Sequence, residues 1–110
     1  MSERYRIAIV EDTDSQRMML VHLLSKKYDV EEFPSGEAFI ASSSDFDAIL
    51  LDIEMHGIDG YETCRCMRVD ARRDDTPVIF VSSHNTPEDR VLAYEAGGDH
   101  FVSKPINIGE

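Results

Sequence analysis

Short apolar runs alternate with longer amphipathic segments along the whole chain. Runs such as RIAIV and PVIFV are bounded by polar residues, which is typical of buried strands. The segments predicted as strands are residues 6–10, 29–33, 47–51, 77–81 and 99–103. The amphipathic segments between them predict helices at residues 13–27, 34–42, 59 to about 72, and 86–98. This alternation predicts a parallel sheet covered by helices on both faces, an α/β doubly wound fold.

Each predicted helix is preceded by a residue that can cap its first turn. The predicted N-caps are Thr13, Ser35, Asp59 and Thr86. Gln16 follows Thr13 by three positions and Glu62 follows Asp59 by three, which is the spacing of a capping box. Pro87 at the first helical position and two glycines at the end punctuate the last helix. The helix starts are therefore better marked than most of the helix ends.

The composition is that of a single acidic globular domain. The 110 residues include 11 Lys and Arg against 22 Asp and Glu, giving a net charge of −11. Such a surface repels phosphate groups, so we expect no direct binding of nucleic acid or of anionic membranes. The sequence has no apolar run long enough for a signal peptide or a membrane span. Cys64 and Cys66 are too few for a disulfide framework or a zinc site, which favours reduced thiols in a cytoplasmic protein.

The carboxyl ends of the predicted strands carry the candidate chemistry. Polar side chains follow the first, third, fourth and fifth strands: Glu11, Asp12, Asp52, Ser82, Ser83 and Lys104. The second strand ends in Phe33 and Pro34 and carries no such group. In open parallel sheets, ligands bind beyond these strand ends. We therefore expect the polar groups to converge on one edge of the sheet.

Three carboxylates at one edge repel one another and raise each other's pKa unless positive charge balances them. Mg²⁺ prefers oxygen ligands of this kind, and Lys104 offers a further positive charge. A metal ion beside a carboxylate nucleophile is the apparatus of phosphoryl transfer to Asp. Because a lone Asp at a strand end is more often a turn former, the hypothesis depends on the joint placement of these groups.

Four motifs resemble those of response regulator receiver domains of two-component signalling, the CheY-like superfamily. They are IAIVEDTDS, AILLDIEM, VIFVSS and FVSKP, in the family's order and approximate spacing. Asp52 comes 40 positions after Asp12, Ser82 comes 30 after Asp52, and Lys104 comes 22 after Ser82. The resemblance runs from the first strand to the fifth. It implies a flavodoxin-like five-stranded parallel sheet with strand order 2-1-3-4-5.

The resemblance also implies a role for each matching residue. Asp52 matches the phosphoacceptor, and Ser82 and Lys104 match the hydroxyl and the lysine that contact the phosphoryl group. Phe101 matches the aromatic switch residue, although it lacks the hydroxyl of the common Tyr. The implied ligands of a Mg²⁺ or Mn²⁺ ion are Glu11, Asp12, Asp52 and the backbone carbonyl of Glu54. Two further matches are the small residue Ser83 and Pro105, which suggests a cis Lys104–Pro105 bond.

By this resemblance the chain is a signalling phosphoacceptor rather than an enzyme acting on a separate substrate. A histidine kinase or phosphotransfer protein would supply the phosphoryl group, and slow autodephosphorylation would remove it. Ser82 would move inward on phosphorylation and Phe101 would turn into the vacated space, switching a face for protein partners. An output domain C-terminal to residue 110 and a homodimer are the partners expected besides the kinase.

The loop after Asp52 departs from the family pattern. His56 stands where the family usually has Pro, and we interpret it as a solvent-facing loop residue rather than a metal ligand. Glu54 and His84 occupy positions, two after Asp52 and Ser82, that tune how water reaches the acyl phosphate in this family. The sequence does not predict the sign of their effect.

The end of the chain is the other departure. After KPINIGE the family continues into a fifth helix, for which Asn107 is a natural N-cap. We therefore interpret residues 1–110 as a single receiver domain that is truncated before its last helix. Without that helix, one face of the sheet is left with an apolar patch.

Two alternatives come from other functional classes. In a phosphatase of the haloacid-dehalogenase type, Asp12 would be the nucleophile and Asp14 the acid. That alternative leaves Asp52 without a role and lacks an acidic pair after the fourth strand. A receiver-like docking module without phosphorylation is the other alternative, and the retained acidic pair, Asp52, Ser82 and Lys104 argue against it.

Overall fold

The computed structural model describes residues 4–105, which form a five-stranded sheet and four helices. The strands are β1 (Arg6–Val10), β2 (Asp29–Phe33), β3 (Ala48–Asp52), β4 (Val78–Ser82) and β5 (His100–Ser103). The helices are α1 (Asp14–Leu24), α2 (Gly36–Ala41), α3 (Gly60–Arg68) and α4 (Pro87–Glu95). All five predicted strands and all four predicted helices are present, so the predicted alternation is confirmed.

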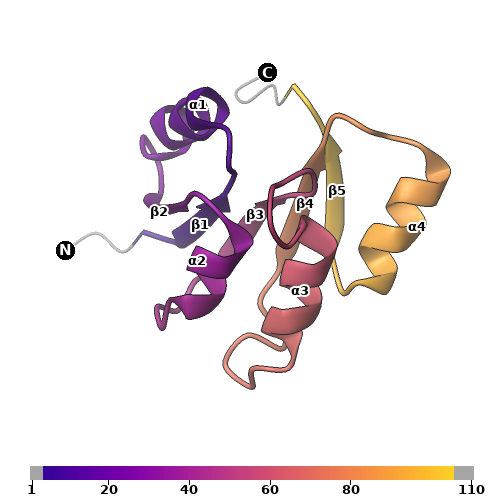
Figure 1. Ribbon diagram of the computed structural model, residues 1–110. Coiled ribbons are helices and arrows are strands. Elements are labelled where there is room, and N and C mark those ends of the chain that lie inside the picture. Colours follow the sequence, from indigo (N-terminus) through magenta and orange to yellow (C-terminus); the bar gives the residue numbers. More distant parts are fainter. Residues whose placement is uncertain (1–3, 106–110) are drawn as a thin grey trace.

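The sheet is entirely parallel, with the order β2-β1-β3-β4-β5 (Figure 1). This order confirms the flavodoxin-like topology that the resemblance implied. It also places β1 and β3 side by side at the centre, with Val10 paired to Leu51. The residues that follow these two strands therefore lie at the same edge of the sheet.

Three of the four predicted N-caps form as expected. The side chains of Ser35, Asp59 and Thr86 each accept a hydrogen bond from a backbone amide in the first turn, and only Thr86 completes a capping box. Both predicted capping boxes are wrong: the Thr13 side chain makes no capping hydrogen bond, and Asp59 accepts from the Glu62 amide without a bond back from the Glu62 side chain. The amide of Gln16 is used elsewhere, because its side-chain oxygen accepts a hydrogen bond from Lys104.

Helix ends differ more than helix starts from the prediction. Helix α1 ends at Leu24 instead of residue 27, and α3 ends at Arg68 instead of about residue 72. Beyond Arg68 the chain makes turns and then reaches β4. Gly97, just after α4, has φ of 106°, a left-handed conformation that ends a helix and that glycine adopts without strain.

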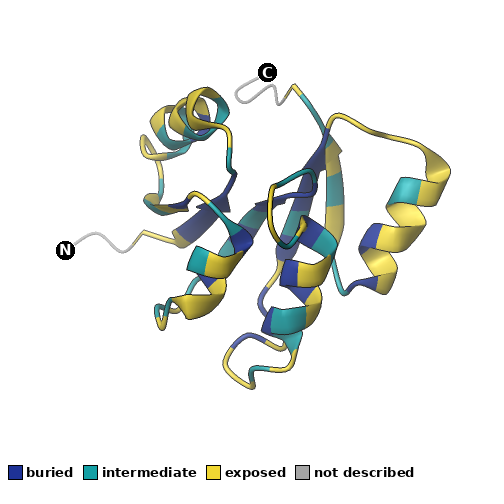
Figure 2. Ribbon diagram, viewed as in Figure 1, coloured by how far each residue is buried: buried dark blue, intermediate teal, exposed yellow. Residues whose placement is uncertain are grey.

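The two faces of the sheet are covered unequally (Figure 2). Alternate strand residues such as Ala8, Ile49 and Phe80 pack under α2, α3 and α4 in one buried cluster. Helix α1 covers the opposite face through the buried Leu20. Beside α1 a hollow of about 470 Å³ is lined by apolar side chains that include Leu50 and Ile79.

The position expected for the start of a fifth helix, with its predicted N-cap Asn107, lies outside the described residues. Within residues 4–105, no helix is long and apolar enough to cross a membrane. Cys64 is buried, Cys66 is half-buried, and both are free thiols, as predicted.

Candidate functional site

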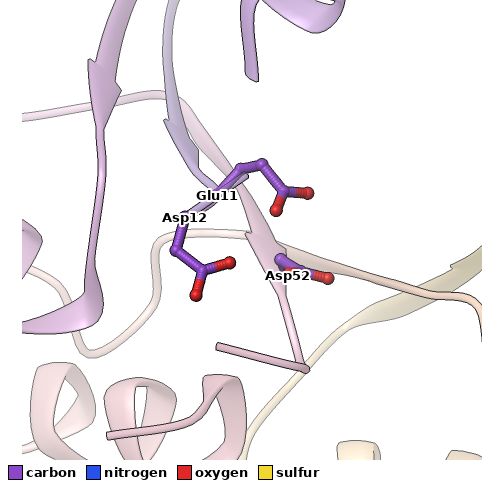
Figure 3. Close-up of side chains that lie close together, drawn as sticks. All are labelled: Glu11, Asp12 and Asp52. Carbon is purple, nitrogen blue, oxygen red and sulfur yellow. The ribbon is translucent and has the colours of Figure 1, made fainter. Parts of the chain in front are cut away.

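Three carboxylates meet where β1 and β3 end. Glu11 and Asp12 follow β1, and Asp52 is the last residue of β3. One oxygen from each carboxylate can be chosen so that all three lie within 4.8 Å of one another, and Figure 3 shows the groups arranged around a common gap. Glu11 and Asp52 are 1% and 3% exposed, so two of the three charges are almost fully withdrawn from water. The predicted convergence of the acidic residues is therefore present.

Lys104 reaches this cluster from the end of β5. Its ammonium nitrogen lies 3.0 Å from Glu11 Oε1 and 3.0 Å from Asp52 Oδ1. It donates a third contact, of 2.6 Å, to the side-chain oxygen of Gln16 on α1. The ammonium group thus donates hydrogen bonds to Glu11 and Gln16 and makes an ion pair with Asp52. Burial lowers the pKa of Lys104, but the hydrogen bonds and charges of Asp52 and Glu11 outweigh it and raise the pKa above its ordinary value, so the lysine stays charged.

Asp52 is the carboxylate most altered by its surroundings. Burial is the main cause that raises its pKa, to about 7; the Glu11 charge adds to the rise and Lys104 opposes it. Repulsion among acids, which the sequence suggested as the cause, is therefore secondary to desolvation. Asp52 Oδ1 is buried and receives no well-directed hydrogen bond, so its 3.0 Å contact with Lys104 is chiefly electrostatic. The site favours a further positive partner for this oxygen.

The donor set fits a hard divalent cation. It consists of carboxylate oxygens on Glu11, Asp12 and Asp52, and one of these oxygens, Oδ1 of Asp52, is buried without a directed hydrogen bond. Oxygen ligands with incomplete protein coordination suit Mg²⁺, which usually keeps several of its waters. These residues therefore have the chemistry to hold Mg²⁺ or Mn²⁺.

Ser82 and Ser83 form a second group, beside the acidic cluster, at the end of β4. Ser82 is 1% exposed, and its hydroxyl donates to Glu54 Oε2 at 2.5 Å. Ser83 is exposed, and its hydroxyl donates to Glu54 Oε1 at 3.1 Å. The backbone amide of His84 donates to the Ser82 oxygen at 2.9 Å. A single carboxylate, from Glu54, thus binds both hydroxyl groups.

The loop between β3 and α3 is fixed by contacts to other elements. The backbone amide of His56 donates to Asp12 Oδ2 at 2.8 Å, and that of Ile58 donates to Glu37 on α2 at 2.9 Å. The imidazole-bearing residue His56 is itself exposed. Gly60 begins α3 so close to β3 that an added Cβ would lie 2.4 Å from the carbonyl oxygen of Asp52. Glycine is required there because backbone packs on backbone.

Phe101 lies on β5 next to Phe80 in register and packs against the core while remaining partly exposed. The guanidinium of Arg90 on α4 lies 5.6 Å from the centre of its ring, a cation–π contact. The Lys104–Pro105 peptide bond is cis. Asp14 pairs with Arg17 at 2.6 Å and is largely exposed, and it is not a member of the acidic cluster.

Comparison with known proteins agrees with this geometry. Residues 7–110 match the response regulator receiver domain family. The chain belongs to this family. The receiver domain is 32% identical to the transcriptional regulatory protein TcrA of Mycobacterium tuberculosis over 108 residues, which is 96% of the chain and 42% of TcrA. It is 36% identical to the nisin biosynthesis regulatory protein NisR of Lactococcus lactis over 107 residues, 94% of the chain and 45% of NisR.

Solved structures of receiver proteins share the fold. The chemotaxis protein CheY4 of Vibrio cholerae superimposes with a TM-score of 0.90 at 26% identity, over 96% of the receiver domain and 90% of CheY4. The response regulator DrrB of Thermotoga maritima gives a TM-score of 0.86 at 30% identity, over 96% of the receiver domain and 48% of DrrB. The receiver domain therefore spans less than half the length of TcrA, NisR and DrrB.

The sequence correctly predicted that the acidic pair, Asp52 and Lys104 of the receiver domain lie together at one edge of the sheet. It missed three side-chain contacts at this edge and beside it: Gln16 with Lys104, Glu54 with the two serines, and Arg90 with Phe101. For Glu54 a signal exists. Asp52 pairs with Val81 across the sheet, so continuing both strands by two residues sets Glu54 beside Ser83.

Proposed function

We propose that this receiver domain accepts a phosphoryl group on Asp52 from a phosphorylated histidine kinase or phosphotransfer protein. The observation that supports the proposal most strongly is the environment of Asp52. This carboxylate is buried at the end of β3, lies 3.0 Å from Lys104, and shares its edge with the acidic pair Glu11 and Asp12. A buried carboxylate with a perturbed pKa and a specific cationic partner is a frequent feature of reactive sites.

In the proposed reaction, a carboxylate oxygen of Asp52 attacks the phosphorus of phosphohistidine in line with the leaving nitrogen. A P–O bond forms, the P–N bond breaks, and its electron pair returns to the imidazole, which takes up a proton. Lys104 stabilises the charge on the phosphoryl oxygens, because its ammonium is already held beside the attacking group. Ser82 supplies a hydrogen bond to the transferred group.

The acidic residues have a second part in this proposal. Glu11, Asp12 and Asp52, with the Glu54 carbonyl, would hold Mg²⁺ or Mn²⁺, which supplies positive charge against the phosphoryl oxygens when bound. Positive charge near Asp52 also favours its ionised form, which is the nucleophile. Hydrolysis of the acyl phosphate by water would slowly return the domain to its resting state.

The proposed output is a change at the α4–β5 face. Once phosphorylated, Asp52 would draw Ser82 toward the phosphoryl group, and Phe101 would turn into the space behind it. Helix α4 already presents exposed apolar side chains, including Val91, Leu92 and Tyr94, on which a partner protein or a second copy of the domain could dock. An output domain farther along the chain and a cytoplasmic location complete the proposal.

The test is incubation of the protein with Mg²⁺ and either acetyl phosphate or a phosphorylated histidine kinase. We expect the wild-type chain to gain one phosphoryl group and Asp52→Asn to gain none. Asp14→Asn serves as a control for loss of one acid near the site, since Asp14 faces Arg17, and it should react like the wild type. No label on the wild-type chain with either donor would refute the proposed function, and label on Asp12 would favour the phosphatase alternative.

A further inference from the structure

The Glu54 side chain occupies the hydroxyl half of the site. Its two carboxylate oxygens accept hydrogen bonds from Ser82 at 2.5 Å and from Ser83 at 3.1 Å. The Ser83 backbone amide adds a longer contact of 3.4 Å to the same carboxylate. An anionic group with several oxygen acceptors is thus already seated on the donors that a phosphoryl group would use.

Ser82 cannot donate to Glu54 and to a phosphoryl oxygen at the same time. A serine hydroxyl has one proton to donate. In the resting structure that proton points to Glu54, while the oxygen accepts from the His84 amide. Ser82 cannot donate to a phosphoryl oxygen until it releases Glu54. The negative charge of Glu54 also opposes the approach of an anionic phosphodonor to the same place.

Space to move the carboxylate exists on its other side. A hollow of about 440 Å³ is lined by Asp12, Thr13, Glu54, Met55 and His56. Glu54 is only half-buried and follows the end of β3, so a change of its side-chain rotamer needs no repacking of the core. The contact is therefore reversible on the time scale of side-chain motion.

We propose that Glu54 is an internal competitor of the phosphoryl group, a latch that holds Ser82 and Ser83 until a phosphodonor displaces it. The inference rests on the proposed function, because it concerns the same reaction at Asp52. Its consequence is selectivity between phosphodonors. Small donors such as acetyl phosphate must open the latch unaided, whereas a docked kinase can use binding energy from its interface to displace Glu54.

Two variants test the latch. Glu54→Ala removes the contacts to both serines, and Glu54→Gln keeps the shape and one acceptor but removes the charge. We expect phosphorylation by acetyl phosphate to accelerate roughly 3- to 10-fold in Glu54→Ala. The acceleration should be smaller in Glu54→Gln, because the amide oxygen still accepts a hydrogen bond from a serine, although a weaker one than the carboxylate does. Glu95→Gln, at the exposed end of α4, changes net charge as Glu54→Gln does and should leave the rate unchanged.

The same substitution made in a Ser82→Ala protein distinguishes the latch from simple repulsion between the Glu54 charge and an anionic phosphodonor. In Ser82→Ala the main contact of Glu54 is gone, so adding Glu54→Ala should accelerate the remaining slow reaction less than twofold. An equal acceleration in both backgrounds would overturn the latch, since simple charge repulsion does not need the Ser82 hydroxyl. No acceleration in the wild-type background would also overturn it.

A measurement without any phosphodonor keeps this inference distinct from the proposed function. The backbone amides of Ser83 and His84 contact Glu54 and Ser82, so their NMR resonances report the latch directly. Both should shift in Glu54→Ala and stay unshifted in Glu95→Gln, with melting temperatures recorded to show that each variant is folded. Unshifted amides in folded Glu54→Ala would refute the latch even if Asp52 is phosphorylated; shifted amides in a chain that takes no phosphate would refute only the proposed function.

Discussion

The ends of β3 and β4 lie side by side, yet their functional side chains are held in opposite ways. Asp52 is buried against Lys104, in a cluster where every charge faces another charge. Ser82 is equally buried, but it is held by Glu54, a half-buried residue beside an open hollow. The first half of the site is built from mutually dependent groups. The second half is closed by one removable side chain.

This contrast predicts opposite effects of substitution. Removing a member of the acidic half should slow phosphorylation or destabilise the fold, because the remaining charges lose their compensation. Removing Glu54 from the hydroxyl half should speed phosphorylation by small donors.

Lys104→Ala should cause the greatest loss. It removes the positive partner of both Asp52 and Glu11, and we expect the rate of phosphorylation to fall about 100- to 1,000-fold, as for loss of a group that stabilises transition-state charge. Rates with acetyl phosphate and Mg²⁺ measure this effect. Lys26→Ala, at an exposed position beyond α1, is the matched control and should retain the wild-type rate. A loss of less than tenfold in Lys104→Ala would show that Lys104 does not act on the phosphoryl group.

Gly60→Ala should disturb the packing of α3 against the end of β3. The added methyl group would meet the Asp52 carbonyl oxygen at 2.4 Å and the Ile53 Cα at 2.8 Å, so α3 must move away from the end of β3. We expect a loss of about 2–3 kcal/mol in the free energy of unfolding, the usual scale of overpacking. Urea denaturation measures it. Glu62→Ala, exposed on the same helix, should change stability by only a few tenths of a kcal/mol.

The raised pKa of Asp52 predicts a pH dependence of the metal-free protein. Since the folded-state pKa of about 7 exceeds the ordinary value of 3.8, folding favours the protonated form. The associated stability is complete below about pH 4 and is lost as pH rises through 7. We expect the wild type to lose about 2 kcal/mol relative to Asp52→Asn over this range, allowing for solvent screening.

Denaturation in the presence of a chelator, at several pH values, measures that difference between the two proteins. Asp52→Asn should lack this component of the pH profile, since its amide does not titrate. Parallel profiles for the two proteins would mean that Asp52 is already ionised at neutral pH without a metal ion.

Gln16→Leu should have the smallest effect on the acidic half. Leucine keeps a similar volume but removes the acceptor that lies 2.6 Å from the Lys104 ammonium. We expect phosphorylation to slow roughly two- to fivefold, the scale of one hydrogen bond. Gln16→Glu restores an acceptor and should recover most of the rate. If Gln16→Leu and the wild type react equally fast, Gln16 does not position the lysine.

The sequence predicted the acidic half better than the hydroxyl half. Strand ends of a parallel sheet converge by topology, so apolar periodicity alone placed Asp12, Asp52 and Lys104 at one edge. The resemblance to receiver domains added the strand order and the roles of these residues. The strand starts were correct to within one residue, and three of the four caps form as predicted, because these signals are local.

What the sequence did not predict depends on side-chain direction between distant elements. Gln16 has the spacing of a capping residue, yet its amide faces Lys104, which lies 88 positions away. Glu54 lies 28 positions from Ser82 and reaches it only because β3 and β4 pair in a particular register. Contacts of this kind depend on strand register and on rotamer choice in the folded molecule, neither of which a short local pattern encodes.

The position of the phosphoryl group on the chain decides whether Asp52 is the phosphoacceptor. The protein is incubated with Mg²⁺ and acetyl phosphate, the acyl phosphate is trapped by reduction with borohydride, and the modified residue is identified by peptide mass spectrometry. We expect modification of Asp52 alone, and none in Asp52→Asn or after removal of the metal with a chelator. Modification of Asp12, or an unmodified Asp52 in the wild-type chain, would contradict it.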